Sequence, residues 1–443
     1  MKKTFLSIML GACLSTAALA DDLSTVYQLA LENDPVVNRA KAEKELAYSG
    51  IKLSRAALLP TISGSISYST GARDNVDFTD TGINVITTDN ESTRMGLSLN
   101  MSLYDHANWI GMDRAEKAAQ QGDANLGAAL QQLIVRSTNA YLAVLREQDN
   151  VEFVKAELRA IERQLEQTKQ RFEVGLTAIT DVHEAQANFD NTNAQLILAE
   201  NTLELRLEEL REITGQYHAD IAELDTDLFS ATQPNPAKVD EWLELAKDSN
   251  LTLLAQRLSK DIAKEDIDAA TAGHYPTLSL NASMDQTDNT FNDFDLPTTD
   301  SESIGITLNI PIYEGGRTQT GVERARSNYV IASENLELTY RQTVRSVRSS
   351  FNAVKASISR IRALEQSVVS ADSALKATEA GFDVGTRTIV DVLNSTRNLF
   401  DARRNLADAR YGFISAIVNL KASAGTLTEQ DLQDINRVLK PAT

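Results

Sequence analysis

Four short segments of the chain place apolar side chains at every second position, with small or polar uncharged side chains between them. They cover residues 61–70, 94–104, 277–285 and 303–313. Because consecutive side chains of a strand point to opposite faces, this period of two predicts four β-strands with one apolar and one polar face. Strands of about 9–11 residues with an apolar exterior and a polar interior are typical of outer-membrane barrels. A half-buried sheet of a soluble protein alternates in the same way, so the strands alone leave both interpretations open.

The segments that follow each strand pair have a helical period instead. Residues 107–172 and 317–382 contain no proline, and their apolar positions step by three and four, as in Val151, Val154 and Leu158. This spacing is an a/d seam, which needs a neighbouring helix. At a rise of about 1.5 Å per residue, each helix would be roughly 100 Å long. We expect helices of this length to lie side by side in a rod or a tube.

The order of elements occurs twice along the chain. The motif LNMSLYD at 99–105 returns as LNIPIYE at 308–314. The sequence therefore divides into a first repeat at 21–214 and a second at 239–426. Each repeat is predicted as helix, strand, loop, strand, very long helix, tight turn and helix.

Other segments connect or interrupt the repeats. The stretches 71–92 and 285–301 are rich in Asp, Asn, Thr and Ser and are predicted as long loops between strands. The linker 215–238 and the C-terminal segment 427–443 are expected to form a small separate equatorial patch of structure.

The first 20 residues have the features of a secretory signal. Lys2 and Lys3 precede an apolar run, and an Ala-Leu-Ala cleavage sequence precedes Asp21. A lipoprotein signal that ends at Cys13 is the alternative, with a very short apolar region. Cys13 is the only cysteine, so cleavage before Asp21 leaves a chain without a disulfide or a thiol nucleophile.

Composition and charge exclude several classes of function. Asp and Glu number 62 against 43 Lys and Arg, which gives a formal net charge of −19 and argues against a nucleic-acid partner. The charge fits a solvated acidic face or an aqueous channel that favours cations. His183-Glu184 lacks a second histidine four residues later, and no phosphate loop, dinucleotide fingerprint or catalytic triad spacing occurs. We expect no enzyme activity, no metal and no cofactor.

A membrane location would force the chain to associate. Four strands cannot close a barrel, because about eight are needed before the interior is even filled by side chains. Open sheet edges in outer-membrane lipid would leave unpaired amides at a cost of several kcal/mol each. Two copies would give a plugged eight-stranded barrel, and three would give twelve strands around a pore. The small polar side chains of the inner face favour the water-filled, wider barrel.

The motifs RFEVGLTAITDV at 171–182 and GFDVGTRTIVDVL at 381–393, with support from 308–316 and 424–432, resemble the TolC family of outer-membrane efflux and secretion channels. The resemblance covers essentially the whole processed chain. It implies a mainly α protein with a membrane β-barrel. Three chains of the family form a homotrimer, with a 12-stranded barrel in the outer membrane of a Gram-negative bacterium and an α-helical tunnel in the periplasm.

The resemblance also implies a function. Members act as exit ducts for multidrug efflux and type I secretion, closed at the periplasmic end. They open when a periplasmic adaptor and an inner-membrane pump of the RND or ABC type dock, and no chemical step occurs in the duct. The alternative is a structural or adhesive surface protein built from trimeric coiled coils, which would not need a duplicated strand set with a polar interior.

The resemblance assigns roles to the two glycine turns. A glycine supplies the left-handed conformation that ends a helix, and in the family these turns are the tips that adaptors grip. The corresponding residues are Val174, Gly175, Leu176, Val384, Gly385 and Thr386.

Asp391 would be the periplasmic aperture residue. On its own it is interpreted as a solvated acid at a helix start, favoured by the helix dipole. By similarity it would form a ring of three carboxylates, whose repulsion raises their pKa values and attracts cations. The family usually repeats the acid one turn later, where this chain has Asn394. We therefore expect one acidic ring and weaker block by multivalent cations.

Five residues match contacts that constrain the entrance between neighbouring coils in the family. The guanidinium of Arg387 offers several donors in a fixed fork, and a carboxylate such as that of Asp181 is its natural acceptor. The family usually has a tyrosine at the position of Phe382, whose hydroxyl joins this network, so one latch is missing here. An exposed helix-start cation is the alternative interpretation of Arg387. The full set is Arg387, Asp181, Thr180, Gln170 and Phe382.

Overall fold

The computed structural model describes residues 21–440 of the 443-residue chain. The predicted signal sequence, with its lipoprotein alternative, lies outside the described residues. The described chain forms two compact units, and each unit takes segments from both sequence repeats. Unit 1 comprises residues 21–40, 127–251 and 341–440, and unit 2 comprises 41–126 and 252–340. The duplication seen in the sequence therefore does not correspond to two spatial domains.

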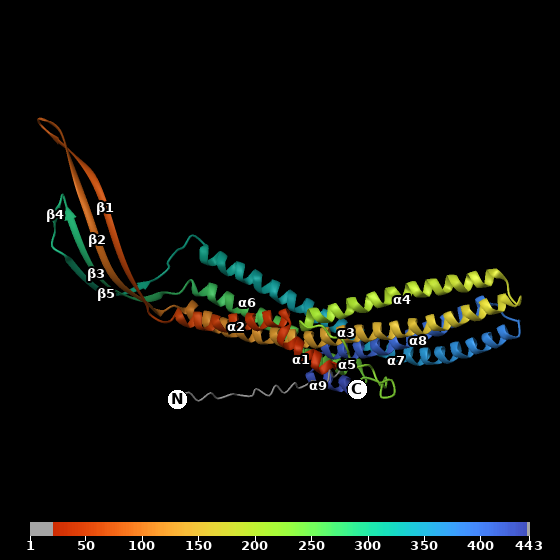
Figure 1. The fold of residues 1–443 in the computed structure, drawn as a ribbon. Helices are drawn as coiled ribbons and strands as arrows, with labels where there is room; N and C mark the ends of the chain where they lie inside the picture. Colours follow the sequence, from red (N-terminus) through yellow and green to blue (C-terminus); the bar gives the residue numbers. More distant parts are fainter. Residues whose placement is uncertain (1–20, 441–443) are drawn as a thin grey trace, which may run out of the picture. The chain divides into compact units, whose positions relative to one another are not determined.

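Helices make up most of the described chain (Figure 1). The two long helices are α3 and α7, and their bounds agree with the predicted segments to within one residue at each end. No described helix combines the length and the hydropathy that a membrane span requires. The helices are α1 Leu23–Asn33, α2 Pro35–Ala56, α3 His106–Glu173, α4 Ile179–Thr214, α5 Val239–Ser249, α6 Leu251–Ala272, α7 Arg317–Asp383, α8 Ile389–Ser423 and α9 Glu429–Asn436.

Unit 2 contains one antiparallel sheet of five strands. β2 pairs with β1 and β3, and β3 also pairs with β5 and, at its end, with the two-residue β4. β1 and β5 are therefore the edges of the sheet among the described strands. The strands are β1 Thr61–Thr79, β2 Gly82–Tyr104, β3 Thr277–Phe291, β4 Phe294–Asp295 and β5 Thr299–Asn309.

The strand ends differ from the prediction. Residues 71–92 were expected to be a loop, but the ladder from Thr61 opposite Asn100 continues without a shift to Thr79 opposite Gly82. From Thr70 to Asp74 and in the residues opposite them, both faces carry mostly polar side chains, so the alternation is interrupted although the backbone pairing persists. Nearer the turn the apolar face returns, with Val76 opposite Val85 and Phe78 opposite Ile83. Figure 1 shows the resulting β1–β2 hairpin extending past the shorter strands.

The second strand pair also departs from the predicted bounds. The stretch 285–301, expected to be a loop, contains the end of β3, all of β4 and the start of β5. At the other end, β5 stops at Asn309 rather than at residue 313. Pro311 explains the early stop, because proline has no N–H to donate to the ladder.

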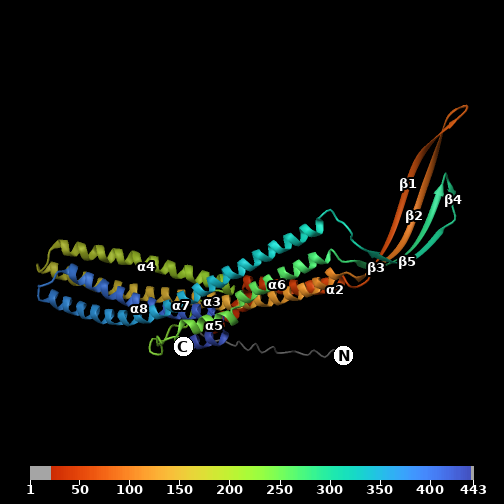
Figure 2. The same cartoon turned by 180° about the vertical axis from the view of Figure 1, so that it is seen from behind.

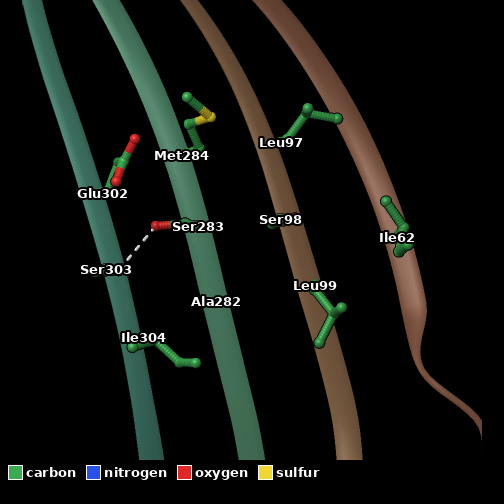
Figure 3. A pocket seen from close by; sticks show the side chains of 10 residues that line it. All are labelled: Ile62, Leu97, Ser98, Leu99, Ala282, Ser283, Met284, Glu302, Ser303 and Ile304. Carbon is green, nitrogen blue, oxygen red and sulfur yellow. Dashed lines mark hydrogen bonds between the residues drawn. The ribbon is translucent and has the colours of Figure 1, made fainter.

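The register confirms the two-faced strands. It aligns Ile62, Leu99, Ala282 and Ile304 in one apolar row across the sheet. The next row consists of serines, in which Ser63 bonds Ser98 at 2.7 Å and Ser283 bonds Ser303 at 2.9 Å. Figure 3 shows part of both rows around a shallow hollow of the sheet. Ile62 is 71% exposed and Ile304 is 79% exposed in the single chain.

Unit 1 has a hydrophobic core that includes the two equatorial segments. Ile221 and Leu224 from the linker pack in the same cluster as Leu432 and Leu439 from the C-terminal segment and as the helices α1, α3 and α8. An isolated bridge joins Leu224 to Leu439. The linker and the C-terminal segment therefore pack into the core of unit 1 rather than forming a separate patch.

A buried ion pair lies in unit 1. Asp34 is 1% exposed, and its two carboxylate oxygens each accept a hydrogen bond of 2.9 Å from the guanidinium of Arg136. Oδ1 also accepts from the N–H of Val37 at 2.8 Å, in the first turn of α2. Asp34 thus caps α2, whose first residue is Pro35, and ties it to α3.

Candidate functional site

The turn between α3 and α4 has the geometry that the sequence predicted. Gly175 adopts φ = 78°, a left-handed conformation that is strained for residues with a side chain. The N–H of Leu176 donates to the carbonyl of Arg171 at 2.8 Å, and the N–H of Gly175 donates to that of Phe172 at 2.9 Å. These two bonds form a Schellman motif, which satisfies the last carbonyls of α3.

The turn between α7 and α8 repeats this arrangement. Gly385 adopts φ = 79°, and its N–H donates to the carbonyl of Phe382 at 3.0 Å. The N–H of Thr386 donates to the carbonyl of Gly381 at 2.8 Å. Figure 2 shows the two turns at the same end of the helices of unit 1. The duplicated sequence therefore builds two equivalent helical hairpins.

The tips present apolar side chains to solvent. Val174 is 70% exposed, Leu176 69% and Val384 75%, and Thr386 is exposed as well. Large apolar side chains that remain exposed at rigid turns are typical of a contact surface for another protein. The six tip residues predicted from the sequence lie together in these two turns.

Asp391 forms a capping box at the start of α8. Its Oδ2 accepts from the N–H of Thr388 at 2.9 Å and from the Thr388 hydroxyl at 3.0 Å, and the Thr388 hydroxyl accepts from the N–H of Asp391 at 3.2 Å. The bonds from the backbone and side chain of Thr388, with a smaller contribution from Arg387, lower the pKa of Asp391. In a single chain the direction is therefore opposite to the rise expected from a ring of three carboxylates.

Asn394 lies one turn after Asp391 and is exposed, while the neighbouring Leu393 is buried. Its side chain therefore does not belong to the apolar face of α8. Asn394 is neutral, so Asp391 is the acid of the two residues predicted for the aperture.

A single chain does not bring Arg387 and Asp181 together as an ion pair among the described residues. Arg387 folds over Gly381 instead: a Cβ built on that glycine would lie 2.7 Å from the Cγ of Arg387. Asp181 accepts a hydrogen bond from the hydroxyl of Thr177 at the start of α4. The expected contact between neighbouring coils stays a prediction for the assembled protein.

Two further members of the predicted entrance set have local surroundings. Gln170 donates to Glu166 at 3.3 Å within its own helix. Thr180 is exposed on the first turn of α4. The bond of Gln170 stays within α3 and Thr180 faces solvent, so the structure of one chain assigns these two residues no role at the entrance.

Phe382 has two sets of partners that sequence reasoning missed. It packs against a small cluster of buried side chains, and the guanidinium of Arg171 lies over its ring, 4.6 Å from the centroid. In the sequence, Arg171 was only one member of a motif. No local pattern indicates that its side chain would contact a ring 211 positions later in the chain. The buried cluster consists of Ile161, Ile389 and Leu393, with Phe189 and Phe382 packed against it.

Metal ligands are not gathered anywhere in residues 21–440: no group of three or more His, Cys, Asp or Glu side chains has the geometry to hold an ion. His183 lies exposed near the start of α4.

Comparisons with known proteins extend over nearly the whole chain. A family model described as "Outer membrane efflux protein" matches residues 26–216 and 242–426. The chain is 45% identical to the outer membrane protein TolC of Vibrio cholerae serotype O1, over 99% of this chain and 98% of that protein. It is 31% identical to the alkaline protease secretion protein AprF of Pseudomonas aeruginosa, over 94% of this chain and 87% of that protein. The fold is similar to that of the outer membrane protein VceC from Vibrio cholerae, with a TM-score of 0.73, 21% identity, and coverage of 91% of this chain and 96% of that one.

Proposed function

The chain belongs to the outer membrane efflux protein family, and from this premise we propose that three copies of it assemble into one continuous duct. As a member of the family, the chain is an outer-membrane exit duct for efflux and type I secretion. Its relatives are channel proteins rather than enzymes. We further propose the number of subunits, the closed barrel and the kind of docking partners.

The observation that carries this proposal is the pair of sheet faces in unit 2. The apolar row is exposed to more than 70% at Ile62 and Ile304, which in water would be an unfavourable surface for a long stretch of sheet. Lipid removes that cost. The serine row on the other face is internally hydrogen-bonded and suits a water-filled interior.

The unpaired edges support a homotrimer. In outer-membrane lipid, β1 and β5 would each leave a row of amides without partners, which costs several kcal/mol per group. Pairing β1 of one copy with β5 of the next removes both edges. Three copies give a barrel of twelve long strands, which is wider than the eight-stranded barrels that side chains fill.

The tips of the hairpins are the proposed periplasmic end. Their exposed apolar residues would receive a periplasmic adaptor, and an inner-membrane pump of the RND or ABC type would complete the path. Asp391, brought near its two symmetry copies, would form the aperture ring. Arg387 and Asp181 would hold neighbouring coils together until docking releases them.

The test is a joint measurement of subunit number and conductance. Purified protein should sediment as a trimer in detergent and should give uniform, stepwise currents in a planar bilayer. A species that stays monomeric and monodisperse without detergent, and that gives no currents, would contradict the proposal. Drug sensitivity after deletion of the gene separates the duct from a purely adhesive protein, since loss of an adhesin leaves drug sensitivity unchanged.

A further inference from the structure

Arg171 connects the two helical hairpins of one chain at the level of their tips. It stands in the last turn of α3, and its guanidinium carbon lies 4.6 Å from the ring centroid of Phe382 in the last turn of α7. Its Nη1 lies 3.9 Å from a carboxylate oxygen of Asp383. One side chain of the first hairpin therefore contacts two consecutive residues of the second through a cation–π contact and an ion pair.

Only the first repeat supplies an arginine for such a contact. The second repeat has Gly381 where the first has Arg171, and Arg387 where the first has Thr177. Arg387 occupies the space beside Gly381, where a Cβ would lie 2.7 Å from its Cγ. The second repeat thus has no side chain that could return the contact, and a symmetric packing of duplicated hairpins does not account for Arg171.

The ring of Phe382, which Arg171 contacts, also packs against buried apolar side chains. Phe382 packs against the cluster of Ile161, Ile389 and Leu393, and Phe189 packs there too. These five side chains come from α3, α4, α7 and α8. Because all four helices share this cluster, the contact of Arg171 adds to packing that joins the two hairpins at the same level.

We propose that Arg171 is a positioning residue that keeps the two tips of each chain together and so holds the periplasmic entrance closed. The inference rests on the proposed duct function. It assigns to the cation of Arg171, over the ring of Phe382, the role of a latch between the two hairpins of one chain. In this proposal, widening the entrance separates the two hairpins and so would break both contacts of Arg171.

The size of the effect follows from the kind of contact. A cation over an aromatic ring at a partly exposed site stabilises the state that contains the contact by about fivefold in an equilibrium constant. An exposed ion pair adds little to this stabilisation. Loss of the contact should lower the closed-to-open ratio by about fivefold per chain. Three copies that open together would change it by about a hundredfold.

The experiment compares single-channel conductance and open probability of the full-length protein in planar bilayers. Arg171→Gln removes the charge, and Phe382→Leu removes the ring. Arg163→Gln is the matched control, because Arg163 is an exposed arginine two turns earlier on α3. We expect both test variants to raise open probability, and the control to behave as the native protein does. Arg171→Lys, which keeps a cation above the ring, should restore most of the closed state.

The double variant Arg171→Gln/Phe382→Leu gives the sharpest readout. If the two residues act through one contact, it should open no more often than either single variant. Fully additive effects, or an Arg171→Gln protein that conducts like the Arg163→Gln control, would overturn the inference while leaving the duct intact. A native protein that forms no channels would overturn the duct itself. Should Arg171→Gln fail to sediment as the native assembly does, Phe382→Leu and Arg171→Lys carry the same comparison.

Discussion

Replacing Arg136 by methionine should destabilise unit 1 more than any exposed charge substitution on the same helix. The change leaves the carboxylate of Asp34, which is 1% exposed, with backbone N–H groups in the first turn of α2 as its partners. Removing one partner of a buried ion pair costs about 3–5 kcal/mol. Because the Arg136 side chain is 28% exposed, water can partly replace it, so we expect the lower figure, about 3 kcal/mol.

Asp34→Asn tests the same pair from the other side. The amide oxygen of asparagine can still cap α2, and the arginine that loses its partner is the more exposed member, so the cost should be about 1–2 kcal/mol. The double variant should be more stable than Arg136→Met alone, because it no longer buries an unpaired charge. Arg159→Met is the control, since Arg159 is exposed on the same helix.

The pH dependence has a definite sign. Burial opposes ionisation of Asp34, but the bonds from Arg136 and the Val37 N–H outweigh it and lower the pKa of Asp34 below the ordinary 3.8. The stability from this pair is therefore fully present above the ordinary pKa and is lost as the pH falls through the folded value. In Arg136→Met the unpaired carboxyl group of Asp34 favours its neutral form. The difference in free energy of unfolding between this variant and the native protein should therefore become smaller as the pH approaches 4.

The assay is unfolding in urea followed by far-ultraviolet circular dichroism, with each variant in the same detergent at pH 7 and at pH 4.5. Equal midpoints for Arg136→Met and Arg159→Met at pH 7 would refute the reasoning. If the difference in urea midpoint between Arg136→Met and the native protein grew as the pH falls, the assigned charge state of Asp34 would be refuted.

Three further results are expected. Asn394→Asp should add a second acidic ring and strengthen block by multivalent cations in planar bilayers, and equal block in the two proteins would contradict the single-ring interpretation. Arg387→Glu should raise single-channel conductance, whereas an unchanged conductance would remove Arg387 from the entrance contacts. Gly425→Ala should lower stability by about 2 kcal/mol or more, because Gly425 has φ = 73° and a Cβ there would lie 2.5 Å from the carbonyl oxygen of Ser249. Gly412→Ala, at a helical position with no atom within 4 Å of the added Cβ, should be neutral or stabilising.

Local patterns in the sequence were sufficient for the helices and the two faces of the strands. The bounds of α3 and α7 follow from an unbroken apolar period that ends at a glycine able to adopt positive φ. The faces of the strands follow from a period of two, which the register then confirms. Both are properties of a few neighbouring residues, and the backbone geometry of a helix or strand fixes them.

The strand ends were not predictable in the same way. The β1–β2 hairpin continues through a stretch, residues 70–74 and 87–91, that is mostly polar on both faces, before apolar pairs return near the turn. The alternation of side chains shows which face of a strand is apolar, but it does not show whether the backbone is paired. It therefore gives no signal in a stretch where neither face is apolar. The stop at Asn309 was also missed, since the strand was predicted to reach residue 313, although Pro311 cannot donate to a ladder.

The sequence alone therefore determined the kinds of element, their order, the glycine turns and the apolar and polar faces of the sheet. Tertiary structure decided which distant residues meet: the linker with the C-terminal segment in the core, Asp34 with Arg136, and Arg171 with Phe382. The physical reason is that helix and strand patterns depend on residues within a few positions of each other. Ion pairs and ring contacts depend on how whole helices pack, which no local period encodes.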